Sequence, residues 1–375
     1  LPKLRSAHPG ARFLVLNPDG KQPEMRGSLV IKRGSVLEVS SPTAQPWIDT
    51  NLALVKIEQR SHPDQVPLYT FSWQGPADSG PQQPARPAED YLLAVAEAGA
   101  FHADLVLELE ENVQKALAEH NPQAWALWNQ VRAYEEFYSR ADEQREKAAA
   151  NVAIVADDFD TSDEVMNLLA RHNIPFKVFS PQDLGSNELQ SFGVVVVFAK
   201  PDQSAAARLA DLASHGDTVV VIEAHGPYLW QKGAAVRLNE TAVSYSIGTG
   251  KILELSEAVT DPETFAQDIR RLLGNQNSLM SLWNGLTTIV VPYPEHGPTK
   301  VMEFVNYAAD SLRLQVQVKG SFASVRYETP EHPCCESLVP VKHDGFTEFV
   351  IPDLHIAGRV HLGSNPAPDS RPTDH

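Results

Sequence analysis

The order of apolar and polar positions divides the chain into three segments, and the first runs from residue 1 to 150. In it, strand-like runs alternate with helix-like runs, which is typical of parallel βα units. The expected strands are 12–17, 35–40, 67–73 and 103–109, and the expected helices are 48–60, 88–100 and 111–150. Four such units leave two open sheet edges with unpaired backbone groups. We therefore expect another structure to cover those edges.

The second segment, residues 151–278, begins with an apolar, β-branched run. Its strands are expected at 152–156, 176–179, 193–198, 218–223 and 251–255, and its longer helices at 203–215 and 261–273. The nearly pure valine run in 193–198 is typical of a strand that is buried on both faces. This segment predicts a complete doubly wound α/β domain.

The third segment, residues 279–363, contains short runs that alternate with period 2 and are separated by Gly and Pro turns. The expected strands are 287–293, 300–307, 312–318, 323–327 and 346–352. This patterning predicts a small antiparallel β-sandwich. Residues 364–375 are rich in Ser, Pro and Asp and predict a disordered tail.

Charge and hydropathy restrict the partners. The formal net charge of −17 disfavours nucleic acid and anionic membrane surfaces, whereas a neutral glycan meets no repulsion. No run approaches the roughly 18 apolar residues that a membrane span needs. The two cysteines, Cys334 and Cys335, are adjacent and lie near His332 and His343. Adjacent cysteines are poor joint metal ligands, so we expect neither a metal nor a cofactor.

Three acids follow the first strand of the middle segment, namely Asp157, Asp158 and Asp160. The carboxyl ends of the strands are the binding edge of a doubly wound sheet, so a cation site there is conceivable, whereas a phosphate would be repelled. The run 248–251 resembles a phosphate loop but precedes a strand instead of opening a helix. No cysteine occurs in this segment. We therefore expect a structural or oligomerisation domain.

The order of the three segments resembles glycoside hydrolases of the β-galactosidase type. The middle segment is similar to their trimerisation domain, which is flavodoxin-like and glutamine-amidotransferase-like. The likeness rests on residues 152–155 with 162–165, 192–198, 282–286, and 305–307 leading to 318–320. It implies a carbohydrate substrate, a homo-oligomer, and a periplasmic or secreted location in preference to a cytoplasmic one.

The first segment resembles the C-terminal half of the (β/α)₈ (TIM) barrel of the dextranase and cycloisomaltooligosaccharide glucanotransferase families. Residues 16–17 with 19–20 resemble the end of barrel strand five, 36–39 resemble strand six, and 89–109 resemble the seventh helix and eighth strand. In those families the nucleophilic aspartate ends strand four, which would fall before Leu1. The resemblance implies either a missing N-terminal barrel half or a degenerate barrel.

This resemblance makes Glu38 the candidate general acid/base, because strand ends on the carboxyl face of a barrel carry the catalytic groups. Glycoside cleavage also needs a second carboxylate, and Asp19 is its nearest candidate in the chain. Both residues have plainer explanations. Glu38 also fits a strand-end glutamate that faces solvent, and Asp19 lies in a Pro-Asp-Gly turn, where aspartate is common for local reasons.

Four residues are candidates for binding the sugar. Asn17 matches the asparagine at the end of barrel strand five, and Tyr69 and Trp73 share one face of the strand expected at 67–73. Gln74 opens a long loop, 74–87, that would overhang the barrel mouth. Packing in the core explains the two aromatic residues equally well.

Together, the patterns and resemblances predict a glycoside hydrolase, or the C-terminal portion of one with its nucleophile upstream. The alternative is a non-catalytic carbohydrate-binding or oligomerisation module. A small-molecule sensor built on the middle segment is a third class.

Overall fold

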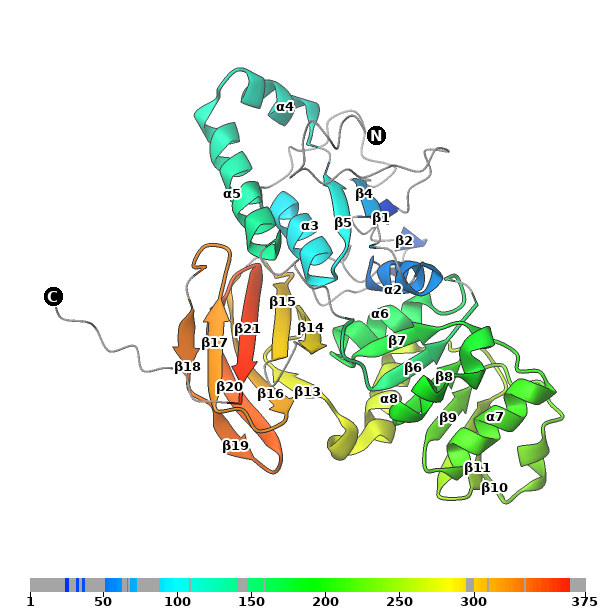
Figure 1. Ribbon diagram of the computed structural model, residues 1–375. Helices are drawn as coiled ribbons and strands as arrows, with labels where there is room; N and C mark the ends of the chain where they lie inside the picture. The colour runs from blue at the N-terminus through cyan, green and yellow to red at the C-terminus, as the bar shows by residue number, and fades with distance from the viewer. Residues whose placement is uncertain are drawn as a thin grey trace, which may run out of the picture.

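The computed structural model describes most of the chain from Asn51 onward (Figure 1). The described residues are 51–62, 66, 68–72, 88–107, 109–139, 147–157, 159–294, 300–308, 310–333 and 335–364, with the backbone of three short strands before them. The fold is mixed α/β, with parallel and antiparallel sheets. The expected strand at 12–17 and the expected tail at 365–375 lie outside the described residues.

The first segment contains a small parallel sheet in the order β1-β4-β5. Its elements are β1 (Glu24–Arg26), β2 (Lys32–Arg33), β3 (Val36–Leu37), α2 (Asn51–Ser61), β4 (Leu68–Ser72), α3 (Ala88–Ala100), β5 (Asp104–Leu107), α4 (Glu111–Ala118) and α5 (Pro122–Ser139). The structure therefore confirms the expected strands 67–73 and 103–109 and the expected helix 88–100. The period of apolar residues was clear in each of these runs.

Two expectations for this segment are wrong. The run expected as a parallel strand at 35–40 contributes β3, which pairs antiparallel with β2 in a separate two-stranded sheet. In its place β1, which we did not predict, pairs parallel with β4. The single helix expected over 111–150 is two helices, because Pro122 cannot continue a helix begun before it. The Asn121 side chain instead caps the new helix by accepting from the backbone N–H groups of Gln123 and Ala124.

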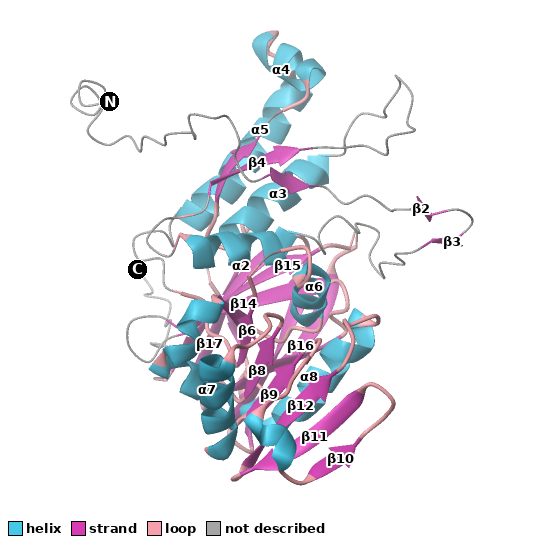
Figure 2. Ribbon diagram, turned by 90° about the vertical axis from the view of Figure 1, so that its right-hand side faces the viewer, coloured by secondary structure: helices cyan, strands magenta, loops and turns pink. Residues whose placement is uncertain are grey.

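The middle segment forms a seven-stranded sheet in the order β10-β11-β12-β9-β8-β6-β7. Its elements are β6 (Val152–Val155), α6 (Asp163–Arg171), β7 (Phe176–Phe179), β8 (Val194–Val197), α7 (Gln203–Ser214), β9 (Thr218–Val221), β10 (Ala235–Arg237), β11 (Ala242–Ile247), β12 (Gly250–Leu255) and α8 (Pro262–Asn277). Figure 2 shows α7 on one side of the sheet and α6 and α8 on the other. The valines of β8 divide accordingly, with Val194 and Val196 in one core and Val195 and Val197 in the other.

The predicted strands of the middle segment are all present, but the hairpin β10–β11 at the sheet edge was not predicted. The run resembling a phosphate loop is the tight turn between β11 and β12, where Ile247 pairs with Gly250. Gly248 has a φ of 58°, and a Cβ there would lie 2.4 Å from the carbonyl oxygen of Ser214. Glycine is therefore required at this position by backbone geometry and not by a phosphate.

The third segment forms two antiparallel sheets, β13-β16-β20-β19 and β14-β15-β21-β17-β18, that enclose a separate core. The strands are β13 (Met280–Trp283), β14 (Thr288–Pro294), β15 (Lys300–Asn306), β16 (Leu312–Lys319), β17 (Ser324–Glu328), β18 (Glu336–Leu338), β19 (Val341–His343), β20 (Phe346–Leu354) and β21 (Ala357–Gly363). The five expected strands are confirmed, while the first strand, the last strand and the short strands β18 and β19 were missed.

The largest hydrophobic core takes residues from all three segments. It joins α2, α3 and α5 to one face of the seven-stranded sheet and to the outer face of β14, β15 and β21. Hydrogen bonds also join the same segments. The Asn173 side chain at the end of α6 donates to the Thr288 carbonyl and accepts from the Val290 N–H, at 3.0 and 2.9 Å. The Tyr293 hydroxyl donates to the Ala100 carbonyl at 2.9 Å.

The division of the chain near residues 150 and 278 stays a prediction, and limited proteolysis measures it. We expect cuts near both positions, since these are the changes in sequence pattern. Because one core is shared by all segments, the cut chain is expected to elute as one particle in size-exclusion chromatography and to separate only in denaturant. Fragments that separate without denaturant would contradict a shared core.

Candidate functional site

The first candidate site is the carboxyl edge of the parallel sheet β1-β4-β5. The register places Arg26 beside Ser72 and Phe71 beside Leu107, so the three strands end together. Helix α4 begins at this edge, and the backbone N–H of Glu110 donates to the Tyr91 hydroxyl at 3.2 Å. Carboxyl edges of parallel strands carry the catalytic groups in barrel enzymes. This edge is therefore the first place to look for the predicted carboxylates.

Most of the predicted site residues lie outside the described residues. Asn17, Asp19, Glu38, Trp73 and Gln74 all fall there, so their roles stay predictions. In the sequence Glu38 comes directly after β3, and β3 pairs antiparallel with β2 in a sheet of its own.

Tyr69 is the one predicted site residue that the structure describes. It lies in β4 and is fully buried in the core shared by the three segments. Burial raises the pKa of its hydroxyl, and the charge of Glu58 adds to this effect. Within the described residues the hydroxyl has no hydrogen-bond partner. Its placement favours the packing explanation over sugar stacking.

Replacing Tyr69 by phenylalanine is expected to change the free energy of unfolding by no more than about 1 kcal/mol, because removing an unsatisfied buried hydroxyl is nearly neutral or stabilising. Tyr69→Ala is expected to cost about 3–5 kcal/mol, since it empties an aromatic-sized volume in the core. Urea denaturation measures both changes. A fall of several kcal/mol for Tyr69→Phe would show that the hydroxyl has a partner.

Two glutamates that sequence analysis did not select lie at the carboxyl edge. Glu110 and Glu111 lie three and four positions after the end of β5, at the start of α4, and Glu111 is exposed while Glu110 is partly buried. The signal that would have found them is the rule applied to Glu38, a carboxylate at the end of an apolar strand. Glu97 is a different case: it is fully buried in α3 and accepts from the Asn51 side chain at 2.9 Å, so it joins α3 to α2.

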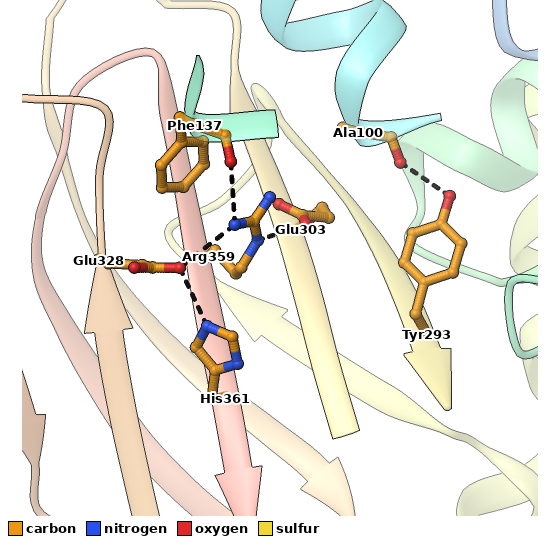
Figure 3. A network of polar contacts seen from close by, with 7 residues as sticks. All are labelled: Ala100, Phe137, Tyr293, Glu303, Glu328, Arg359 and His361. Carbon is orange, nitrogen blue, oxygen red and sulfur yellow. Dashed lines mark hydrogen bonds and ion pairs between the residues drawn. The ribbon is translucent and has the colours of Figure 1, made fainter. Parts of the chain in front are cut away.

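A second group of carboxylates lies where α5 meets the sandwich (Figure 3). Arg359 of β21 donates from Nε to Glu303 of β15 at 2.6 Å, and from Nη1 to Glu328 of β17 at 3.3 Å. The same Nη1 donates to the Phe137 carbonyl at 3.2 Å, and the guanidinium lies 4.3 Å from the Phe137 ring centre. His361 Nε2 lies 3.0 Å from the same Glu328 oxygen, Oε1.

These carboxylates hold the fold together and are not a catalytic pair. Glu303 is 1% exposed and Arg359 is 3% exposed, so no substrate reaches them. Burial raises the pKa of Glu303, although the neighbouring guanidinium acts in the opposite direction. Burial also acts to raise the pKa of Glu328, but the bond to His361 and the charges of His361 and Arg359 outweigh it and lower that pKa. The ion pair joins β15 to β21, and the bond to the Phe137 carbonyl joins β21 to α5.

The carboxyl edge of the seven-stranded sheet is the third candidate. Asp157 and Asp160 are exposed there, and Asp158 lies outside the described residues. Arg60 of α2 donates to the Ala156 carbonyl at 2.5 Å and to the Asp157 carbonyl at 3.3 Å. Across the described ranges no group of three or more His, Cys, Asp or Glu side chains is placed to hold a metal ion. The first segment thus contacts the edge at which doubly wound domains commonly bind ligands.

A small pocket lies between α2, α6 and β14. Its walls are mainly apolar, and its polar side chains are Lys56 and Asn173, the latter bonded to β14. Burial, followed by the charge of Lys177, lowers the pKa of Lys56 to about 8. Sugars need several convergent polar groups, so this pocket is a poor glycan site.

Cys335 is exposed. Among the described helices none is long and apolar enough to cross a membrane.

Comparison with known proteins gives structural relatives only. No family model matches the chain, and no curated protein matches it. Solved structures of several glycoside hydrolases do match. A catalytic mutant of a GH42 β-galactosidase from G. stearothermophilus aligns with a TM-score of 0.56 and 10% identity, over 87% of this chain and 58% of that one.

Two further structures align similarly. For α-L-fucosidase isoenzyme 2 from Paenibacillus thiaminolyticus the TM-score is 0.54 with 11% identity, over 80% of this chain and 60% of that one. For β-galactosidase from Bacillus circulans sp. alkalophilus the TM-score is 0.52 with 12% identity, over 79% and 60%. The chain thus has a glycoside-hydrolase-like fold and spans at most about three fifths of these relatives.

Proposed function

We propose that this chain takes part in hydrolysis of an O-glycosidic bond, with Glu38, the residue that follows β3, as general acid/base. Asn17, Trp73 and Gln74 bind the sugar. Tyr69 supports them from the core. The second carboxylate is Asp19, Glu110 or a group supplied from outside this chain.

The proposed mechanism needs two carboxyl groups with different tasks. The acid protonates the leaving oxygen, and the second carboxylate attacks the sugar or activates a water molecule. A separation of about 5–5.5 Å between them gives retention of the anomeric configuration, and about 6.5–9.5 Å gives inversion. Glu38 takes the acid role because it directly follows an apolar strand and matches the glutamate of the dextranase-like pattern.

The observation that supports the proposal most strongly is the joint architecture. A parallel βα sheet, a doubly wound sheet and a two-sheet sandwich pack on one core, and this arrangement aligns as a whole with glycoside hydrolases over 79–87% of the chain. Fold alone does not fix chemistry, so the reaction rests on the strand-end carboxylates.

The direct test is hydrolysis of a panel of aryl α- and β-galactosides, glucosides and fucosides, followed by unlabelled oligosaccharides. The proposal expects turnover of at least one substrate well above the uncatalysed rate. No turnover on the whole panel, by this chain or by one extended at its N-terminus, would overturn it.

The alternative function is a non-catalytic carbohydrate-binding or assembly module. The buried contacts between the segments favour a supporting role for the middle domain, since Arg60 of α2 contacts its carboxyl edge. Glycan binding without turnover would identify this function.

A further inference from the structure

The outer face of the four-stranded sheet carries an exposed tryptophan beside a row of polar side chains. Trp283 at the end of β13 is 45% exposed, and the neighbouring Leu286 is 79% exposed. Most large aromatic side chains in the described part of the chain are buried, because leaving such a surface in water is costly. Trp283 and Leu286 together leave a large apolar surface in water next to the polar row.

The sheet register shows what surrounds Trp283. It pairs with Gln315 of β16, which pairs with Val350 of β20. The next row on the same face is Ser281, Gln317, Glu348 and Val341. Directly paired residues point to the same side of a sheet, so these two rows form one surface. We name this surface, defined by these seven residues, the Trp283 face.

The Trp283 face is open to solvent and mainly polar. Gln315 is exposed, whereas Gln317 and Glu348 are partly buried and bonded to each other at 2.9 Å. Strands lie about 4.8 Å apart and the two rows about 7 Å apart. The distance from β13 to β20 is thus about 10 Å.

We propose that the Trp283 face binds a neutral glycan chain, as a site separate from the carboxyl edge of the parallel sheet. The indole ring offers a flat apolar surface to the C–H face of a pyranose, in keeping with its electron-rich π face. Side-chain amides and a carboxylate are the groups that pair with sugar hydroxyls, as donors and acceptors. The net charge of −17 disfavours acidic polysaccharides.

A second copy of the chain fits this face less well. A stable interface buries about 1,600 Å² in total and is depleted of charge at its centre. Here Gln315, Gln317 and the charged Glu348 lie on the two central strands together with Val350, and the apolar Trp283 and Val341 lie on the two edge strands.

Affinity gel electrophoresis of the whole chain tests the proposal with soluble galactan, glucan and mannan, and with polygalacturonate as the acidic counterpart. We expect retardation in at least one neutral gel. Trp283→Ala is expected to raise the dissociation constant about tenfold or more, as truncation of an anchoring aromatic residue commonly does. The matched control is Trp125→Ala, because Trp125 is also exposed, at 40%, but lies on α5.

Several outcomes overturn the proposal: no retardation in any neutral gel, retardation only by polygalacturonate, or equal effects of the two tryptophan variants. A dimer in size-exclusion chromatography that Trp283→Ala dissociates, without glycan binding, would assign the face to self-association instead. Retardation that survives Glu38→Gln but not Trp283→Ala separates this site from the proposed catalytic one. The result does not depend on turnover, so this proposal and the proposed hydrolysis can fail independently.

Discussion

Replacing Arg359 by methionine is expected to lower the free energy of unfolding by about 3–5 kcal/mol, the typical cost of leaving a buried charge without its partner. Arg359 is the cation that contacts both Glu303 and Glu328, and it also donates to the last turn of α5 through the Phe137 carbonyl. Losing it removes charge pairing and a bond between the first segment and the sandwich. Chemical denaturation at neutral pH measures the change.

Two variants serve as controls for this prediction. Arg313→Met removes an exposed arginine from a strand of the same sandwich and is expected to cost less than about 0.5 kcal/mol. The double variant Glu303→Met with Arg359→Met is expected to recover much of the loss, because an apolar pair of similar volume replaces a buried ion pair at little cost. A double variant as unstable as Arg359→Met would show that the bond to α5 dominates.

The loss in Arg359→Met is also expected to depend on pH. Burial raises the pKa of Glu303, and without the opposing guanidinium that pKa rises further. Between the unfolded pKa and this raised folded pKa the native state binds more protons, so its stability falls as pH rises. Below the unfolded pKa Glu303 is protonated in both states. The difference in the free energy of unfolding between Arg359→Met and the parent protein is therefore expected to be largest at neutral pH and to become smaller on acidification.

Glu38→Gln is expected to lower turnover of an oligosaccharide about 10²–10⁴-fold, the usual contribution of a positioned general acid. Glutamine keeps the size of the side chain but cannot protonate a leaving group. A substrate with a strongly activated leaving group, such as a dinitrophenyl glycoside, needs little protonation and is expected to lose much less. The ratio of the two losses separates an acid from a residue that merely positions the substrate.

Glu58→Gln is the matched control for that experiment. Glu58 lies in α2 of the same segment and pairs with His62 on the surface, so its replacement is expected to leave turnover unchanged. The acid must be protonated to act, so the rate of the parent protein is expected to fall as pH rises through the pKa of Glu38. The Glu38→Gln variant is expected to show no such fall in its pH–rate profile. Unchanged turnover in Glu38→Gln would show that Glu38 is not the acid and is a glutamate at the end of a strand that faces solvent.

Local patterns alone predicted much of the fold. The valine run of β8 indicated a strand buried on both faces because no polar position interrupts it, and the sheet places its valines alternately in two cores. Period-2 runs likewise predicted five strands of the sandwich. The break between α4 and α5 was also readable, since Asn121-Pro122 is both a capping signal and a stop.

Some elements were missed because their sequence signal is weak or ambiguous. The run at 35–40 has the composition of a buried strand, but its described residues pair with β2 and not with the parallel sheet. A short apolar run does not encode its partner. The strands β10, β18 and β19 have only three residues each, too few to show a period.

The sequence by itself determined the three kinds of segment, because hydrophobic period and turn residues act over a few neighbouring positions. Only the tertiary structure decided how those segments join. Glu303 and Arg359 lie 56 positions apart and Arg359 and Phe137 lie 222 apart, so no local pattern could reveal that they share one buried network. In the same way, the sequence around Tyr69 was equally consistent with a residue that stacks on a sugar and with a core residue. Its burial decided between them, and burial depends on which distant elements cover a strand.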